Sequence, residues 1–192
     1  MRRLSNIVVC LALAALLTGF CGQVASQQDE PKSPNERLST VIRTPATCPI
    51  TQPPSVEFVP PTPYPTTISP NGFWLGSEKL WTSRSKDGLW RGYWTTENGV
   101  KRKIYFDKVF WWRKGYDWRT ENPPRLKVSG RRLDAPASPF YLDQAHPAFM
   151  RNPAMLTGID IPSVGCWEIT GDYKSEKLTF VVWVVDPPEN ID

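Results

Sequence analysis

The hydrophobic pattern is strongest near the C-terminus, where two runs rich in β-branched and aromatic residues flank a short polar segment. The first run spans residues 165–171 (GCWEITG) and the second spans residues 178–185 (LTFVVWVV). Residues 172–177 between them favour a turn, so the two runs predict an antiparallel hairpin. The second run is apolar on both alternating faces, which is typical of a strand covered on both sides. We therefore expect it to be a central core strand.

Shorter strand-like runs recur upstream, with turn signals between them. Lys86-Asp87-Gly88 and Glu97-Asn98-Gly99 both predict tight turns, because glycine readily adopts a positive φ angle. The expected strands are residues 78–82, 89–94, 101–112, 125–134 and 155–161. In the run 101–112, the residues expected to face inward are Ile104, Phe106 and Val109.

The fold class follows from the spacing of these runs. Strands recur every 8–15 residues, and no long segment has the 3.6-residue period of an amphipathic helix. Residues 135–153 are interrupted by prolines and predict a long loop, with room for one helical turn. We predict an all-β protein, an immunoglobulin-like antiparallel β-sandwich spanning residues 71–188.

The N-terminal third has a different composition, since residues 27–70 contain 11 of the 20 prolines. Proline fixes φ and removes a hydrogen-bond donor, so neither a central strand nor a helix is expected there. Residues 27–44 are polar, whereas residues 45–66 include apolar side chains that can be buried. We predict a proline-rich linker and strap, whose second half lies extended along the sandwich.

The first residues predict export. Arg2-Arg3 precedes an uncharged apolar run at 7–17, which is too short to span a bilayer but fits a signal peptide. Val24-Ala25-Ser26 then offers a cleavage site before Gln27, giving a signal peptide of residues 1–26. The mature protein is expected to be periplasmic, exposed on the cell surface or secreted.

A lipid anchor is the alternative form of export. Cys21 follows Leu16-Leu17-Thr18-Gly19-Phe20, which is similar to a bacterial lipobox. Lipobox cleavage requires a small residue immediately before the cysteine, and Phe20 is not small. Cleavage before Gln27 would instead remove Cys21.

Cys48 and Cys166 are the two cysteines of the predicted mature chain. Cysteines of an exported protein usually pair, although two free buried thiols are the alternative. If Trp167 and Ile169 point into the sandwich, then Cys166 points to the outer face. Its partner should therefore come from outside the sandwich, which predicts a disulfide with Cys48 in the strap.

Several short motifs resemble an uncharacterised family of secreted bacterial proteins. They are Cys48-Pro49 before the proline-rich strap, KLWT at 79–82, FWWR at 110–113, GRRLDAP at 130–136 and GCWEITG at 165–171. The resemblance covers residues 48–185. It implies the same cysteine pairing and a small immunoglobulin-like sandwich, and it implies no activity.

Patterns typical of enzymes are scarce. His146 is the single histidine, so neither a multi-histidine metal site nor a Ser-His-Asp triad is indicated. Asp117, Glu121 and Glu168 could supply paired carboxylates for glycoside hydrolysis, but solvated positions explain them as well. Asp107 and Asp160 receive the same interpretation. We predict no cofactor and no metal.

Charge is distributed unevenly along the chain. Residues 84–132 contain 14 Lys/Arg against 5 Asp/Glu, a net +9, whereas residues 133–192 contain 3 against 9, a net −6. Aromatic and basic residues alternate most densely in one segment, and such surfaces can stack on sugars and contact anionic polymers. The candidate binding residues are Trp111, Trp112, Arg113, Lys114, Tyr116, Trp118 and Arg119. The competing interpretation places the aromatic residues in the core, with arginine side chains packed over them.

Together these features predict an exported, non-enzymatic cell-envelope protein that acts as a binding or structural module. The expected partner is an anionic envelope glycan or an envelope protein, and no nucleic acid is expected for an exported chain. A small envelope hydrolase that uses paired carboxylates is the alternative.

Overall fold

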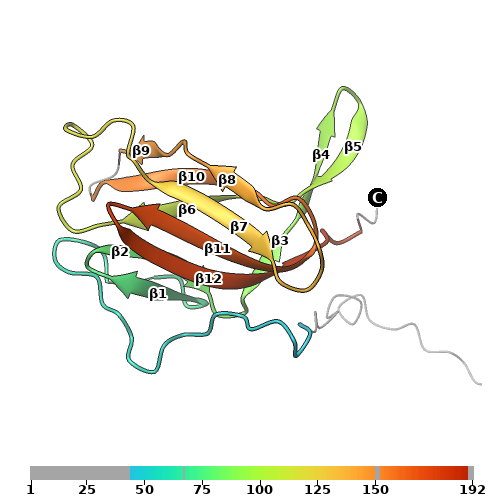
Figure 1. Cartoon of the computed structure of the whole chain (residues 1–192), viewed down its shortest axis with the longest axis horizontal. Helices are drawn as coiled ribbons and strands as arrows, with labels where there is room; N and C mark the ends of the chain where they lie inside the picture. The colour runs from blue at the N-terminus through green and yellow to red at the C-terminus, as the bar shows by residue number, and fades with distance from the viewer. Residues whose placement is uncertain (1–43, 67, 150–151, 190–192) are drawn as a thin grey trace, which may run out of the picture. The chain divides into compact units, whose positions relative to one another are not determined.

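A computed structural model describes residues 44–66, 68–149 and 152–189. The described chain is built from β-strands arranged as two sheets and one separate hairpin (Figure 1). The strands are β1 Gly72–Ser77, β2 Leu80–Ser85, β3 Leu89–Arg91, β4 Tyr93–Glu97, β5 Val100–Ile104, β6 Phe106–Trp112, β7 Lys127–Arg132, β8 Phe140–Leu142, β9 His146–Ala148, β10 Ala154–Asp160, β11 Gly165–Tyr173 and β12 Glu176–Val185.

The strand order places the C-terminal hairpin at the centre of one sheet. That sheet has the order β3-β12-β11-β7-β8, and the other has the order β1-β2-β6-β10-β9. Strands β4 and β5 form a hairpin of their own, which projects beyond the two sheets (Figure 1). The predicted all-β sandwich with a proline-rich strap is confirmed, except that β3 pairs with β12 in parallel.

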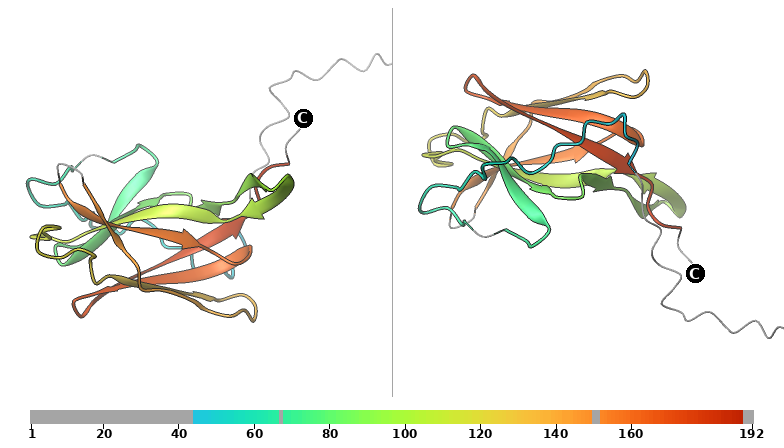
Figure 2. Two further views of the ribbon diagram at one scale, coloured as in Figure 1. Left: turned by 90° about the horizontal axis from the view of Figure 1, so that it is seen from above. Right: turned by 90° about the horizontal axis from the view of Figure 1, so that it is seen from below.

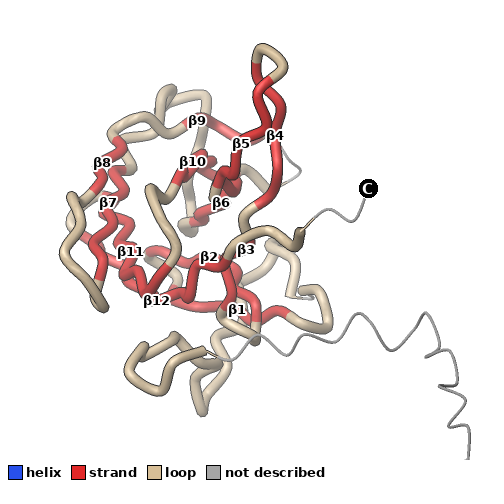
Figure 3. The backbone as a smooth tube through the Cα atoms, turned by 90° about the vertical axis from the view of Figure 1, so that its right-hand side faces the viewer, coloured by secondary structure: helices blue, strands red, loops and turns tan. Residues whose placement is uncertain are grey.

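The main core lies between the two sheets, and the strands surround it when the molecule is viewed from one end (Figure 3). Phe180, Val182 and Val184 of β12 are buried in it, as the apolar alternation predicts. Trp167 and Ile169 of β11 pack beside them. Alternation along the strands therefore leaves the neighbouring residues, Cys166 among them, on the outer face.

The strap crosses that outer face and is fixed there by the predicted disulfide. Cys48 is bonded to Cys166 with their Cα atoms 5.6 Å apart. The backbone N–H of Thr51 donates to the Val181 carbonyl at 3.1 Å, and the Thr51 hydroxyl accepts from the Val181 N–H at 2.8 Å. Figure 2 shows the strap running alongside β12. The disulfide is consistent with an oxidising, exported environment.

Further along, the strap covers part of the opposite sheet. Phe58 and Tyr64 both pack on Trp81 of β2, with ring centroids 5.7 and 4.9 Å away. The Tyr64 hydroxyl donates to the Arg113 carbonyl at 2.9 Å, just beyond the end of β6. A second, smaller core thus forms on the outer side of this sheet, with Trp74 and Trp112 as further members.

Some predicted local features differ from the structure. The turn at 86–88 does not return the chain to a neighbouring strand but carries it from β2 to β3 in the other sheet. The expected loop at 135–153 contains the short strands β8 and β9. Val109 is buried as expected, whereas Ile104 and Phe106 are only half-buried, because the chain leaves the projecting hairpin there.

The predicted signal peptide 1–26, Cys21 and the linker up to residue 43 lie outside the described residues. Within the described part, no helix is long and apolar enough to cross a membrane.

Candidate binding cleft

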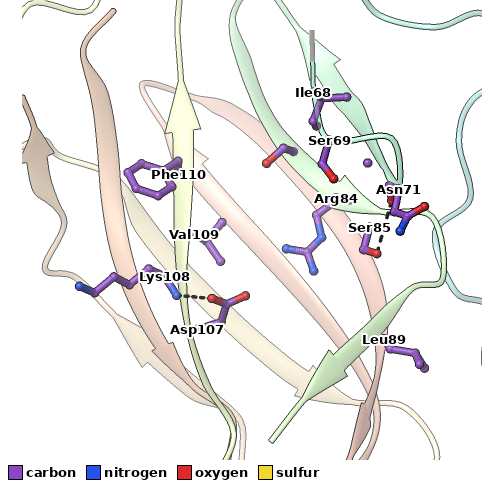
Figure 4. Close-up of a pocket in the computed structure, with 12 residues that line it drawn as sticks. Ile68, Ser69, Asn71, Arg84, Ser85, Leu89, Asp107, Lys108, Val109 and Phe110 are labelled. Carbon is purple, nitrogen blue, oxygen red and sulfur yellow. Dashed lines mark hydrogen bonds between the residues drawn. The ribbon is translucent and has the colours of Figure 1, made fainter. Parts of the chain in front are cut away.

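The sheet that contains β1 and β2 divides in its middle. Strands β2 and β6 pair only at Trp81–Trp112 and Thr82–Trp111. Beyond these pairs the two strands separate, and a cleft of about 270 Å³ opens between them. It is lined by Ile68, Ser69, Asn71, Gly72, Ser83, Arg84, Ser85, Leu89, Asp107, Lys108, Val109 and Phe110, most of which are labelled in Figure 4.

Arg84 is the residue of β2 that points into this cleft from the inner side of the sheet. Leu80 of the same strand is a core residue, so alternation along β2 places Arg84 on the inner face as well. The guanidinium carbon lies 4.3 Å from the ring centroid of Phe180 and 5.5 Å from that of Trp90. The two rings belong to the opposite sheet, and such contacts stabilise a cation that has lost part of its water.

Among the described residues, no hydrogen bond or ion pair reaches the guanidinium of Arg84. Asp107 of the lining and Asp87 outside it act on Arg84 through their charges, and neither is bonded to it. Asp107 accepts a hydrogen bond from the Lys108 N–H at 2.7 Å, and Asp87 accepts one from Arg91 at 2.7 Å. Figure 4 shows Arg84 between the two separated strands with Asp107 on the far side. The donors of Arg84 thus have no acceptor within the described part of the chain and can serve a ligand.

Burial lowers the pKa of Arg84 to about 10, and the negative charges of Asp107 and Asp87 partly oppose this shift. The side chain consequently stays protonated at neutral pH. A cation held in a partly desolvated cleft without an acceptor attracts an anionic group more strongly than an exposed arginine does, because less water screens it.

The rest of the lining complements this charge. Ser69, Ser83 and Ser85 provide hydroxyls, whereas the side chain of Lys108 extends away from Arg84 (Figure 4). The apolar part of the lining consists of Ile68, Leu89, Val109 and Phe110. Guanidinium groups bind carboxylates, sulfates and phosphates through paired N–H donors, so the cleft suits an anionic group on a small polar molecule.

The aromatic and basic segment that begins at the end of β6 and continues past it does not form the expected binding surface. Trp111 is fully buried in the main core, and its indole N–H donates to the Thr157 hydroxyl at 3.0 Å. Trp112 and Tyr116 are also buried, the first under the strap and the second in the main core. For these three residues the competing interpretation, core packing, is the correct one.

The remaining residues of the segment are dispersed. Arg113 packs over the Tyr173 ring at 5.6 Å and is half-buried, while Lys114 is exposed and pairs with Glu78 at 2.8 Å. Trp118 is half-buried beside Phe149, and the exposed Arg119 lies over its ring. The seven predicted residues therefore do not form one continuous ligand surface.

The three candidate catalytic carboxylates have separate partners. Glu168 is on the outer face of β11 and pairs with Arg131 at 2.6 Å. Glu121 accepts a hydrogen bond from the hydroxyl of Tyr173, a core residue, at 2.8 Å. Asp117 accepts from the Arg119 N–H at 3.0 Å and so closes its own turn. Glu168 and Glu121 thus lie on opposite sides of the sheet and do not form a facing pair.

Arg84 was not among the residues singled out from the sequence, although a signal for it exists. In the stretch Leu80-Trp81-Thr82-Ser83-Arg84, the apolar Leu80 is expected on the inner face of the strand. Side chains alternate between the two faces, so Arg84, four residues later, is expected on the inner face too. The sequence does not reveal where β2 and β6 separate, and this separation makes an inward arginine accessible.

His146 lies on the edge strand β9 and is exposed. Within the part of the chain that the structure describes, no group of three His, Cys, Asp or Glu side chains is placed to hold a metal ion. Comparison with protein-family models, with curated proteins and with solved structures finds no match to the chain.

Proposed function

We propose that this chain is an exported, non-enzymatic cell-envelope protein that binds an anionic envelope glycan, with the Arg84 cleft receiving an acidic group of the glycan. The acidic group is a carboxylate, sulfate or phosphate carried by a sugar. The resemblance to secreted bacterial proteins and the predicted signal peptide provide the expectation of export, and the Cys48–Cys166 disulfide supports it.

The observation that carries the proposal is the state of the Arg84 guanidinium. It is held over Phe180 and Trp90, has no acceptor among the described residues and faces a cleft that contains hydroxyl groups. Placing a cation in such a position costs free energy, because the lost hydration is not replaced by an ion pair. A bound anion would replace that hydration, which explains why the position favours ligand binding.

Binding of acidic sugars to the mature chain, residues 27–192, tests this proposal. Trigalacturonate provides a carboxylated probe and a heparin-derived tetrasaccharide a sulfated one, while maltotriose serves as the uncharged comparison. Titration calorimetry should detect at least one of the acidic probes, and any heat from maltotriose should be the same for the parent chain and for the Arg84→Gln variant. The Arg84→Gln variant should weaken binding about tenfold or more, because it removes a charge-assisted pair of hydrogen bonds.

Arg125→Gln is the matched control, since Arg125 is exposed and its side chain has no partner among the described residues. It removes the same charge from the whole molecule and should leave the affinity within about twofold, as expected for a screened surface charge. Equal losses in the two variants would show that binding follows net charge, and the proposal for the cleft would then be wrong.

A further inference from the structure

The outer face of the other sheet has an uncovered polar region beside the strap. Four residues that carry hydroxyl groups lie opposite one another on neighbouring strands: Tyr141 pairs with Ser129, Ser129 with Thr170, and Thr170 with Thr179. The row therefore crosses β8, β7, β11 and β12. The hydroxyls of Thr170 and Thr179 are 2.8 Å apart and hydrogen-bonded.

Tyr141 is the exposed aromatic residue of this row, with 76% of its surface accessible. A shallow hollow of about 380 Å³ lies on one side of it, and another of about 330 Å³ lies on the other. Both hollows are lined by Tyr141, Ser129 and Thr170. Their volumes are in the lower part of the roughly 300–1,000 Å³ range of small-molecule sites. Because the Tyr141 ring borders both hollows, they suit an extended ligand with repeating units, such as a chain of sugars.

The charges around the row balance. Arg131 pairs with Glu168 at 2.6 Å, and Lys177 lies 3.7 Å from Asp172. Lys127 and Asp143, which line the first hollow, add one further charge of each sign. The face therefore has no net charge to attract an ionic ligand. Its complement is an uncharged molecule rich in hydroxyl groups, in contrast to the Arg84 cleft with its unpaired cation.

We propose that this face is a second binding site, which takes an uncharged glycan chain laid across β8, β7 and β11. The Tyr141 ring packs against one face of a sugar ring, since C–H groups of sugars and aromatic faces are both apolar. Ser129 and Thr170 exchange hydrogen bonds with sugar hydroxyls, as does the Arg131–Glu168 pair. The neighbouring sugar units occupy the two hollows.

A panel of uncharged hexasaccharides tests the site on the mature chain: cellohexaose, maltohexaose, chitohexaose and mannohexaose. Amide chemical shifts measured by NMR during titration should move for residues of β7, β8 and β11 with at least one of the four. Tyr141→Ala should weaken that binding about tenfold or more, whereas Tyr141→Trp should retain it. Thr170→Val removes a hydroxyl without changing the shape of the side chain and should give an intermediate loss.

Tyr93→Ala is the matched control, because Tyr93 is also an exposed tyrosine but lies on the projecting hairpin. It should leave hexasaccharide binding unchanged, and so should Arg84→Gln. If none of the four sugars shifts this face, or if Tyr141→Ala binds as well as the parent chain, the second site does not exist. Loss of binding in Arg84→Gln would likewise overturn it, because the sugars would then occupy the cleft.

Discussion

The two ends of the sandwich each place an arginine on the inner side of the same sheet, and they treat it differently. Arg84 of β2 opens into a cleft, whereas Arg113, just after β6, is half-buried with one guanidinium nitrogen fully enclosed. Both guanidinium groups lie over aromatic rings of the opposite sheet, Arg84 over Phe180 and Arg113 over Tyr173. The two guanidinium groups are thus placed in the same way, and they differ in whether another segment of the chain packs over them.

The segment that connects β6 to β7 closes the Arg113 end. Leu126 and Tyr116 of this segment are buried in the main core, and Glu121 accepts hydrogen bonds from Tyr173 and the Arg125 N–H. One nitrogen of Arg113 is fully buried without a hydrogen-bond partner among the described residues. Within residues 44–66 and 68–149, no segment of this kind covers the gap at the Arg84 end, because β2 turns away to reach β3. An inward arginine therefore supports packing where a loop covers it and is available to a ligand where two strands separate.

The largest expected effect comes from opening the closed end. Leu126→Ala removes a fully buried side chain of the covering segment and should lower the free energy of unfolding by about 3–5 kcal/mol. Leu89→Ala at the cleft is the matched change, because Leu89 is half-buried and already borders open space. It should cost about 1 kcal/mol, since little new cavity forms. Urea denaturation measures both, and equal losses would contradict the difference between the two ends.

The strap joins the two ends, and its disulfide can be removed. Cys48→Ser combined with Cys166→Ser should destabilise the fold by about 2–4 kcal/mol, because the unfolded chain gains conformational freedom. Tyr64 should still hold the strap near Arg113, so the loss of order should be confined to residues around Cys48. Hydrogen exchange can locate the loss. Equally faster hydrogen exchange along residues 45–66 would show instead that the disulfide alone holds the strap.

The fold was predictable because its signals are local. The apolar alternation of residues 178–185 and the turn at Asn98-Gly99, where both residues have positive φ angles, are readable without knowing the rest of the structure. The pairing of Cys48 with Cys166 followed from the same alternation, since it placed Cys166 on the outer face.

The candidate site was not predictable in the same way. Trp111 and Tyr116 pack against Phe180 and Tyr173 of the opposite sheet. Trp112 is buried in one cluster with Tyr64 of the strap, so all three are covered by distant parts of the chain. Residue type alone cannot distinguish an exposed aromatic residue from a covered one. The exposure of Arg84 likewise depends on where β2 and β6 stop pairing, which is a property of the whole sheet.

Replacing each inward arginine with methionine separates its effects on stability and on binding. Arg84→Met should stabilise the protein by about 1 kcal/mol, because removing an uncompensated charge outweighs the loss of the contact with Phe180. It should also abolish binding of the acidic sugar. Arg113→Met should leave binding unchanged, since Arg113 faces no ligand. Thermal unfolding and calorimetry measure the two properties, and a clear loss of stability in Arg84→Met would indicate a structural role instead.

The smallest expected effect concerns Glu121 at the closed end and depends on pH. Burial alone would raise the pKa of Glu121, but hydrogen bonds from the Arg125 N–H, Lys174 and Tyr173 outweigh burial and lower it. The folded state therefore favours the ionised carboxylate. This contribution to stability is present above the unfolded pKa of about 4.5 and is lost as the pH falls through the lower pKa of the folded state.

Glu121→Gln should consequently be less stable than the parent chain by about 0.5–1 kcal/mol at pH 7, a modest value because Lys174 is half-exposed. The difference should shrink below pH 4.5 and vanish once the pH is well below the lowered pKa of the folded state. Glu97→Gln is the control, since Glu97 pairs with Arg102 at 3.4 Å on the projecting hairpin and both side chains are well exposed. It should have no measurable effect at any pH. If Glu121→Gln follows the same flat curve, the hydrogen bonds of Glu121 do not stabilise the closed end, and packing of Leu126 and Tyr116 must hold it alone.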